Sequence, residues 1–362
     1  MKYVDEYRDR KLIAKVAGLI REACGRKAYT FMEVCGTHTM AIARFGLRDL
    51  LPENVRLISG PGCPVCVTPV SYVDKAIAIA RMDGVTVATF GDMMRVPGSR
   101  SSLEKEKAGG ASVEAVYSTD DALEMARMRP DRQIVFLGVG FETTAPMVAA
   151  SVIAAKREAL GNYSVLSAHK TMPEAIEALL VGRDVAVDGF ILPGHVRAVI
   201  GTRPYARIAG RYGKRCVIAG FEPLDVMEAI LMMVRQSRPK VEIQYRRVMS
   251  SSGNRMAMKD MALVFQKTDA VWRGIGRIAD SGLRIRKGYA RFDAERRFRP
   301  RSGSGREPKG CICGDVLKGL SAPSDCRLYG RSCTPDHPVG ACMVSGEVTC
   351  ATYYRYGNKT GL

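Results

Sequence analysis

The sequence lacks a long apolar segment. No stretch of its 362 residues approaches the uninterrupted apolar length of a membrane-spanning helix, and the N-terminus, MKYVDEYRDRKLIAKV, alternates charged with apolar residues where an export signal would be apolar. We therefore expect a globular cytoplasmic protein without membrane contact. Because 46% of this long chain is apolar, two or three domains are expected.

A recognisable nucleic-acid-binding motif is also missing, although the net charge of +18 would suit an acidic partner. Much of the positive excess lies between Arg273 and Lys309. We interpret this segment as a solvated, partly mobile, arginine-rich connector. A docking surface for an acidic protein is the second interpretation. Nucleic-acid binding would need a steep salt dependence to be considered, so no nucleic-acid partner is expected.

Short β-branched runs alternate with longer amphipathic runs from about Val55 to Gln236, which predicts an α/β fold with parallel sheets. The expected strands cover residues 55–59, 85–90, 112–117, 134–140, 164–169, 189–194 and 216–220. The clearest expected helices cover residues 71–84, 120–130, 144–160 and 223–236.

Two of these strands end in similar Pro-Gly turns, which suggests an approximate internal duplication. One strand leads into Gly60-Pro61-Gly62-Cys63, and another into Pro193-Gly194-His195. Open α/β sheets bind ligands at the carboxyl ends of their strands, so two similar small Rossmann-like domains facing each other would form a cleft between these loops.

The boundaries of three domains follow from this pattern. The loop-rich tail contains too little apolar mass to fold easily without a metal or a cluster, so we assign it to a separate Cys-rich iron-sulfur domain. The expected domains are residues 46–129 with GPGCPVC, residues 130–240 with PGHV and GFEPLD, and residues 1–45 together with 241–362.

Eleven cysteines in a chain expected to remain in a reducing compartment favour metal or redox chemistry over a disulfide framework. Cys24 and Cys216 stand alone, three cysteines lie in the first fifth of the chain, and six lie near its end. Two separate sulfur sites are the simplest interpretation.

The first sulfur site includes Cys35 in the motif CGTHT. Gly36 permits a tight turn, and the following Thr and His side chains can donate hydrogen bonds around one exposed sulfur. A thiolate is a soft-metal ligand and a nucleophile once nearby positive charge or N–H groups lower its pKa. A lone cysteine beside a turn is usually only buried, but His38, three residues away, favours a function.

GPGCPVC adds Cys63 and Cys66. This spacing resembles that of thiol oxidoreductases, in which one thiolate attacks and the other resolves. A zinc knuckle would need a second ligand pair, and none follows nearby, so zinc is the weaker interpretation unless Cys35 and a histidine complete a site in space.

The tail gives the stronger metal signal. Its six sulfurs exceed the four that a cubane cluster or a structural zinc would take, which suggests four ligands and one dithiol pair. A structural zinc with two spare thiols is the alternative. The six are Cys311, Cys313, Cys326, Cys333, Cys342 and Cys350.

Further polar residues lie beside Gly or Pro in loops that follow expected strands, as residues of loop-borne sites do. Singly, Glu142, His169, His195 and Glu222 would more often be helix caps or satisfied core groups. Together they are interpreted as the lining of a cleft. Their loops, with a fifth of the same kind, are GVGFETTAP, AHKTMPEA, PGHVRAVIG, GFEPLD and SSSGNRMA.

CGTHT, GPGCPVC, GVGFETTAP, PGHV, GFEPLD, SSGN and the six-cysteine tail closely resemble the HypD family of hydrogenase maturation proteins, over nearly the whole chain. The resemblance implies a scaffold on which the Fe(CN)2CO unit of [NiFe]-hydrogenases is assembled and later passed to the hydrogenase large subunit. A small HypC-like chaperone would share the iron, and a HypE-like partner would donate cyanide. Cys35 would be the iron ligand, Cys63 and Cys66 the adjacent redox pair, and His38 a neighbour of the iron. Arg197 follows PGHV where the family often has a small polar residue, so no hydroxyl role carries over to that loop.

The tail is also similar to ferredoxin:thioredoxin reductase, in which a [4Fe-4S] cluster sits beside a disulfide. That likeness assigns Cys313 and Cys342 to the dithiol, and the cluster to Cys311, Cys326, Cys333 and Cys350. The hypothesis is that electrons pass from the cluster through the tail dithiol and the Cys63/Cys66 pair to iron at Cys35. The alternative function is a stand-alone iron-sulfur dithiol reductase, for which CGTHT would be incidental.

Overall fold

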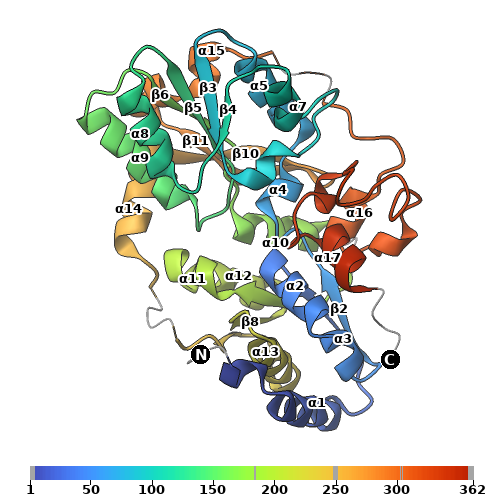
Figure 1. Ribbon diagram of the computed structural model, residues 1–362. Helices are drawn as coiled ribbons and strands as arrows, with labels where there is room; N and C mark the ends of the chain where they lie inside the picture. Colours follow the sequence, from blue (N-terminus) through green and yellow to red (C-terminus); the bar gives the residue numbers. More distant parts are fainter. Residues whose placement is uncertain (1–4, 183–184, 248–251, 302, 304, 358–362) are drawn as a thin grey trace.

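The computed structural model describes residues 5–182, 185–247, 252–301, 303 and 305–357. Its strands form two parallel sheets and one antiparallel hairpin (Figure 1). The α/β class is confirmed, and all the strands expected from the sequence are present within two residues of their expected bounds. None of the described helices combines the length and apolarity needed to cross a membrane.

The first sheet has an interrupted order. Its strands, in spatial order, are β2 (Val55–Ser59), β1 (Tyr29–Glu33), β7 (Gly189–Pro193), β8 (Arg215–Ala219) and β9 (Val241–Ile243), all parallel. β2 follows β1 in the chain and pairs with one edge of β1. β7 comes much later in the chain and pairs with the other edge of β1. The loops at the carboxyl ends therefore diverge above β1, and such a switch point is where open α/β sheets place ligands.

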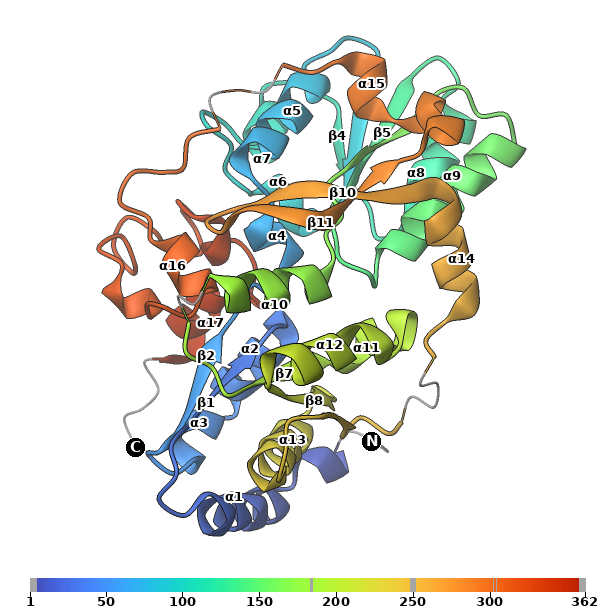
Figure 2. The same cartoon turned by 180° about the vertical axis from the view of Figure 1, so that it is seen from behind.

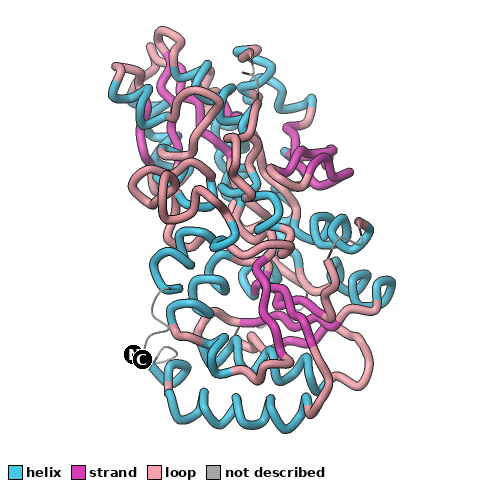
Figure 3. Tube along the Cα trace, turned by 90° about the vertical axis from the view of Figure 1, so that its right-hand side faces the viewer, coloured by secondary structure: helices cyan, strands magenta, loops and turns pink. Residues whose placement is uncertain are grey.

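Helices cover both faces of this sheet because successive side chains of a strand point to opposite faces. Ile191 and Val217 pack with one helical layer, and Phe190 and Cys216 pack with the other. Figure 3 shows the sheet between these layers. The first layer contains α1 (Arg10–Cys24) and α13 (Pro223–Arg235); the second contains α10 (Met172–Val181), α11 (Gly194–Ile200) and α12 (Arg203–Tyr212).

The second sheet has the same kind of winding, with β3 and β5 at its centre. Its strands, in spatial order, are β4 (Val113–Ala115), β3 (Val85–Thr89), β5 (Gln133–Gly138) and β6 (Tyr163–Ser167). One face packs against α5 (Val70–Ala80) and α7 (Leu103–Ala108), and the other packs against α8 (Thr119–Met128) and α9 (Ala145–Arg157). The short helices α4 (Pro64–Val67) and α6 (Gly91–Met94) follow β2 and β3.

Residues after Ser252 form elements that the sequence did not predict. They are α14 (Arg255–Val264), β10 (Phe265–Trp272), β11 (Gly276–Ile285), the 3-10 helix η2 (Lys287–Phe292) and α15 (Ala294–Phe298). Figure 2 shows the hairpin of β10 and β11 between the second sheet and α10. The interpretation of a solvated connector is therefore wrong from Arg273 to Phe298. Ile278, Ile285 and Phe292 are buried, so several apolar residues among the arginines pack inward.

The strands do not follow the expected domain boundaries. Segment 46–129 supplies β2 to the first sheet and β3 to the second, and segment 130–240 is divided in the same way. The two Pro-Gly loops also belong to one sheet, because β2 and β7 are the two neighbours of β1. The N-terminal segment supplies β1 and α1 to the first sheet, so it does not form a unit separate from that sheet.

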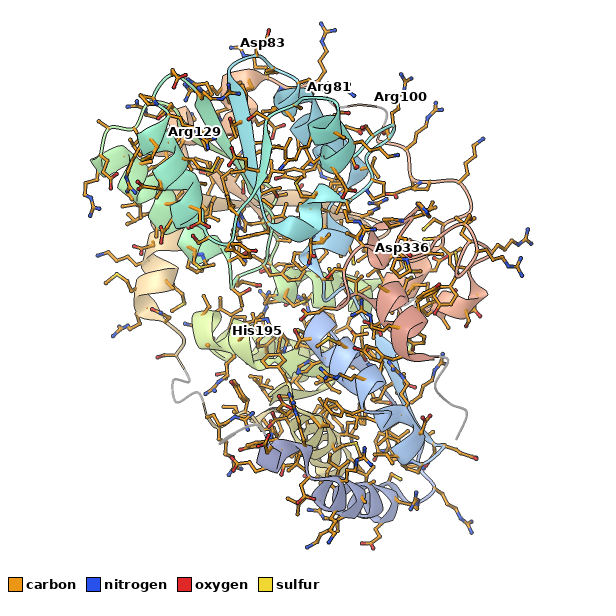
Figure 4. The ribbon with its side chains drawn as sticks, in the orientation of Figure 1. Arg81, Asp83, Arg100, Arg129, His195 and Asp336 are labelled. Atoms are coloured by element: carbon orange, nitrogen blue, oxygen red, sulfur yellow. A yellow bond between two sulfur atoms is a disulfide. The ribbon has the colours of Figure 1, made fainter. Side chains whose placement is uncertain are left out.

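The cysteine-rich tail lies beside both sheet units (Figure 1). Its elements are α16 (Cys313–Leu317), η3 (Pro323–Asp325), η4 (Ala341–Met343) and α17 (Thr349–Tyr356). α17 packs against α2 (Gly36–Arg44), which is followed by α3 (Leu47–Leu50). Arg95, after α6, donates a hydrogen bond to the carbonyl oxygen of Asp336 at 3.1 Å. Asp336 is labelled in Figure 4.

Candidate functional site

Cys35 lies at the switch point of the first sheet, between the end of β1 and the start of α2. The loop after β2 touches it: an ideal Cβ placed on Gly62 would lie 2.1 Å from the backbone nitrogen of Cys35. The N–H of Gly36 donates to the carbonyl oxygen of Gly62 at 3.3 Å, and the N–H of Gly60 donates to that of Glu33 at 2.8 Å. The two sulfur motifs, CGTHT and GPGCPVC, are therefore joined through their backbones.

The tail closes the same site from a third direction. An ideal Cβ on Gly36 would lie 2.5 Å from the carbonyl oxygen of Glu347. The hydroxyl of Thr37 donates to the Glu347 carboxylate at 3.3 Å. Three segments far apart in the chain thus meet around Cys35, which is only 5% exposed.

The sulfur of Cys35 carries a proton at neutral pH. Burial raises the pKa of the Cys35 thiol to about 11, although the backbone N–H groups of His38 and Thr37 point toward the sulfur and oppose that rise. Metal ligation requires the thiolate, so a metal bound here would displace this proton.

The ring of His38, three residues after Cys35, is a neutral hydrogen-bond acceptor. Its Nε2–H donates to the carbonyl oxygen of Gly220 at 2.8 Å, which leaves Nδ1 with a lone pair and no partner among the described residues. Burial lowers the pKa of His38 to about 4, so the ring stays uncharged. Its side chain is fully buried.

Phe221 brings His38 and His195 together. Its ring centroid lies 4.9 Å from that of each histidine, so residues from the segments that follow β1, β7 and β8 meet at one aromatic ring. Burial lowers the pKa of His195 to about 4. Figure 4 labels His195 on the side of the first sheet that faces the second. Sequence reasoning missed Phe221, whose only signal is an aromatic residue directly after a strand in GFEPLD.

Glu33 is a second residue that sequence reasoning missed. Its side chain is fully buried at the end of β1, two residues before Cys35. It accepts a hydrogen bond from the hydroxyl of Ser59 at 2.6 Å and one from Arg48 at 3.4 Å. Burial raises the pKa of Glu33, and these partners oppose the rise. The sequence does carry a signal for Glu33, because it is a charged residue within the otherwise apolar run FMEV.

Cys63 and Cys66 lie between the Cys35 loop and the tail. The N–H of Cys66 donates to the sulfur of Cys63 at 3.4 Å. The Cys66 thiol in turn donates to the carbonyl oxygen of Ala341 at 3.9 Å, one residue before Cys342. Burial raises the pKa of the Cys66 thiol. The pair therefore contacts both sulfur regions of the chain.

The six tail cysteines line one small cavity. Cys313 and Cys342 are joined in a disulfide, and Cys311, Cys326, Cys333 and Cys350 are free. Burial raises the pKa of Cys350, and the three other free thiols raise it further. Over the described ranges, no three His, Cys, Asp or Glu side chains are arranged to hold a metal ion as they stand.

The other candidate residues have partners outside the Cys35 loop. Glu142 and His169 follow β5 and β6 of the second sheet, and Glu142 Oε1 accepts from the N–H of Met172, at the start of α10, at 2.9 Å. Glu222 pairs with Arg8 at 2.5 Å. Glu142 and Glu222 thus each have a local structural role.

Two further loops singled out in the sequence are PGHVRAVIG and SSSGNRMA. Arg197, after PGHV, is buried and donates through Nη1 to the carbonyl oxygen of Tyr245 at 3.4 Å. Ser250 and Ser251 of the SSSGNRMA loop lie outside the described residues.

Glu142 predicts a pH dependence of stability. Burial raises the pKa of Glu142 to about 7, so folding favours its neutral form. The stability of the wild type should fall as the pH rises from about 4.5, where the unfolded chain titrates, to about 7. Glu142→Gln stays neutral and keeps the oxygen that accepts from the N–H of Met172. The free energy of unfolding of the wild type should fall by about 3 kcal/mol over this pH range because of Glu142, and that of the variant should not. Urea unfolding across this pH range checks the difference, and parallel curves would contradict it.

Comparison with known proteins identifies the family. A family model described as "HypD: Hydrogenase formation hypA family" matches residues 10–357. The chain belongs to the HypD family. The hydrogenase maturation factor HypD of Rhizobium leguminosarum bv. viciae is 48% identical over 369 residues, which cover 99% of this chain and 96% of that protein. HypD of Azotobacter vinelandii is 48% identical over 373 residues, covering 99% and 98%. HypD of Escherichia coli K12 is 44% identical over 366 residues, covering 98% of each.

Proposed function

We propose that this chain is a hydrogenase maturation factor that holds iron on Cys35 while the Fe(CN)2CO unit of [NiFe]-hydrogenases is assembled. The observation that carries the proposal is the position of Cys35. Its sulfur lies at a switch point, faced by the N–H groups of Thr37 and His38, and its backbone contacts the loop that leads to Cys63. The iron unit is the cargo of this site.

The chemistry of the cargo suits a thiolate site. Cyanide and carbon monoxide are strong-field ligands that require low-spin ferrous iron, and soft thiolate ligands bind iron well. Cys35 would release its proton when iron binds. His38, in the same motif as Cys35, stays neutral and buried, so it adds no positive charge to this region.

The Cys63/Cys66 pair would keep this site reduced. The contact of the Cys66 thiol with Ala341 supports an exchange with the tail pair. A Cys313/Cys342 dithiol would pass two electrons and two protons to a Cys63–Cys66 disulfide, which leaves Cys313 and Cys342 as the disulfide and Cys63 and Cys66 as thiols. No further reactant is needed for that step.

The four free tail cysteines fit a [4Fe-4S] cluster. All four line one cavity, and each ionised thiol there raises the pKa of Cys350, so a cationic iron-sulfur core would relieve their mutual repulsion. Gly340 leaves room, since a Cβ there would lie 2.8 Å from the sulfur of Cys311. When bound, such a cluster supplies single electrons. Its ligands would be Cys311, Cys326, Cys333 and Cys350.

Two partners follow from the family resemblance. A small HypC-like chaperone would share the iron with Cys35, and a HypE-like protein would donate cyanide. Infrared spectra of the chain purified anaerobically with both partners test the function. Cyanide and carbonyl stretching bands are expected. Their absence under loading conditions would contradict the scaffold.

The alternative function is a stand-alone iron-sulfur dithiol reductase. It is favoured by the disulfide between Cys313 and Cys342 beside four free cysteines. In that case the chain would reduce a disulfide substrate through Cys63 and Cys66 and would show no iron-cyanide bands. The same infrared experiment therefore separates the two functions.

A further inference from the structure

The outer edge of β2 carries backbone hydrogen-bonding groups without partners. β2 lies at one edge of the first sheet and pairs there with β1 (Figure 2). The N–H of Gly60 donates to the carbonyl oxygen of Glu33 in β1 at 2.8 Å, so in this parallel ladder the even-numbered residues of β2 face β1. The N–H groups of Leu57 and Ser59 therefore point outward. No partner for either is found in the described part of the chain.

A groove of about 550 Å³ runs along this edge. Residues 55–59 of β2 line one side of it, and the tail lines the other side with residues 321–323, Thr349 and Tyr353. Leu57 and Ser59 are each only 6% exposed. Because backbone N–H groups at buried residues are almost always paired, we expect the groove to hold an occupant that offers hydrogen-bond acceptors.

An extended polypeptide segment matches this edge best. Its carbonyl and N–H groups alternate with the spacing of a strand, so it can continue the ladder of β2. A second copy of this chain does not fit, because the tail stands beside β2 as the opposite wall of the groove. Two copies that approached each other through β2 would be separated by their own tails.

The charges of the groove select an acidic segment. Arg56 lies within β2, is exposed and lines the groove, and no ion pair of Arg56 is found among the described residues. An opposite charge at the facing position of a neighbouring strand would pair with it directly. Asp49 and Glu53 also line the groove, but both precede the strand. The net charge of +18 further favours an acidic partner over a basic one.

We propose that the outer edge of β2 docks an extended acidic segment of a partner protein, which joins the five strands of the first sheet as a sixth. The backbone of the segment pairs with Leu57 and Ser59, and a carboxylate of the segment pairs with Arg56. β2 leads into the loop that contacts Cys35, so the docked partner is held next to the candidate site. Docking needs no iron and no thiol chemistry, so it does not rest on the proposed function.

A synthetic peptide with the sequence Thr-Val-Glu-Val-Val-Thr, blocked ends and a fluorescein label tests the docking. Its glutamate can lie opposite Arg56 while a valine two residues later lies opposite Ile58. Fluorescence anisotropy during titration with the full chain should show saturable binding, with a dissociation constant below about 1 mM. Hydrogen-exchange mass spectrometry should show slower exchange in residues 55–59 when the peptide is bound.

Two N-methylated forms of the peptide test the backbone pairing. Each form carries methyl groups on one set of alternate amides, and only one of the two sets faces β2 in the bound strand. Methylation of that set should weaken binding about tenfold or more, because it removes hydrogen bonds to the edge. Methylation of the other set should leave binding unchanged.

A charge exchange tests the role of Arg56. Arg56→Glu should weaken binding of the peptide about fivefold, and a peptide with lysine in place of glutamate should recover that loss. Arg100→Glu is the matched control. Arg100 is exposed in the loop before α7, on the second sheet unit (Figure 4), and should not affect binding.

Several outcomes would overturn the proposal. They are a lack of saturable binding, equal binding of the two N-methylated forms, and slower exchange only outside residues 55–59. A dimer in sedimentation velocity that the peptide dissociates would assign the edge to a second copy instead. If Arg56→Glu fails to fold, the methylated peptides with the wild type still decide. The peptide can bind a chain that shows no iron-cyanide bands, so the two proposals fail separately.

Discussion

Cys35→Ala is expected to abolish the cyanide and carbonyl infrared bands of the loaded chain, while the visible absorbance of the tail cluster stays at the wild-type level. Cys35 is the thiol at the switch point of the first sheet, and the four proposed cluster ligands line a separate cavity. Removing one buried sulfur therefore removes the proposed iron ligand without touching the proposed cluster ligands. Infrared and visible spectra of the same anaerobic sample measure both effects.

Cys24→Ala is the matched control for this experiment. Cys24 is also a buried cysteine, at the end of α1, where its thiol donates to the carbonyl oxygen of Arg21 at 3.4 Å. The same atoms are removed far from the switch point, so the infrared bands should persist. Wild-type bands in Cys35→Ala would rule out Cys35 as the iron ligand.

Gly62→Ala is expected to have the second large effect. The new methyl group would lie 2.1 Å from the backbone nitrogen of Cys35 and 2.3 Å from the carbonyl carbon of Val34, so the two loops must separate. Overpacking of this kind lowers the free energy of unfolding by about 1–3 kcal/mol. A displacement of about 1 Å at a reacting group can slow a reaction about 100-fold, and we expect a similar loss in the rate of iron loading.

Gly91→Ala controls for the added methyl group. Gly91 begins α6, and an ideal Cβ there meets nothing within 4 Å among the described residues. Its iron loading should match that of the wild type, and its unfolding free energy should remain equal or rise slightly. Time courses of the infrared bands measure loading, and urea denaturation measures stability. Equal loading rates in Gly62→Ala and the wild type would mean that the close contact of the loops is not required.

The strands could be predicted from the sequence because buried parallel strands are short β-branched runs, and runs such as residues 134–140 stand out from their neighbours. The pairing of the strands could not. β1 and β7 are neighbours, yet more than a hundred residues separate them, and nothing local in either strand encodes that contact. Consecutive strands are neighbours in most sheets, which is why β2 and β3 were grouped together.

The candidate site was predictable where a motif concentrates chemistry in a few residues. Cys35 and Cys63 lie in such motifs, and the structure brings their loops into contact. Phe221 and Arg273 carry no such signal. Arg273 is one of many arginines in its segment, and only the hairpin turn distinguishes it by burying its side chain. This burial depends on segments that are far apart in the sequence, and the amino-acid composition carries no information about their contacts.

β7 is synthesised well after β1 and β2, because it follows them by a long stretch of chain. About 130 residues separate Ser59 from Gly189, which is roughly 6–26 s of translation at about 5–20 residues per second. Until then β1 has one unpaired edge, and the Glu347 contact that covers the Cys35 turn emerges later still. A nascent chain therefore presents the Cys35 thiol without its enclosure. The site around Cys35 forms only when almost the entire protein has left the ribosome, so the proposed loading of iron would follow translation.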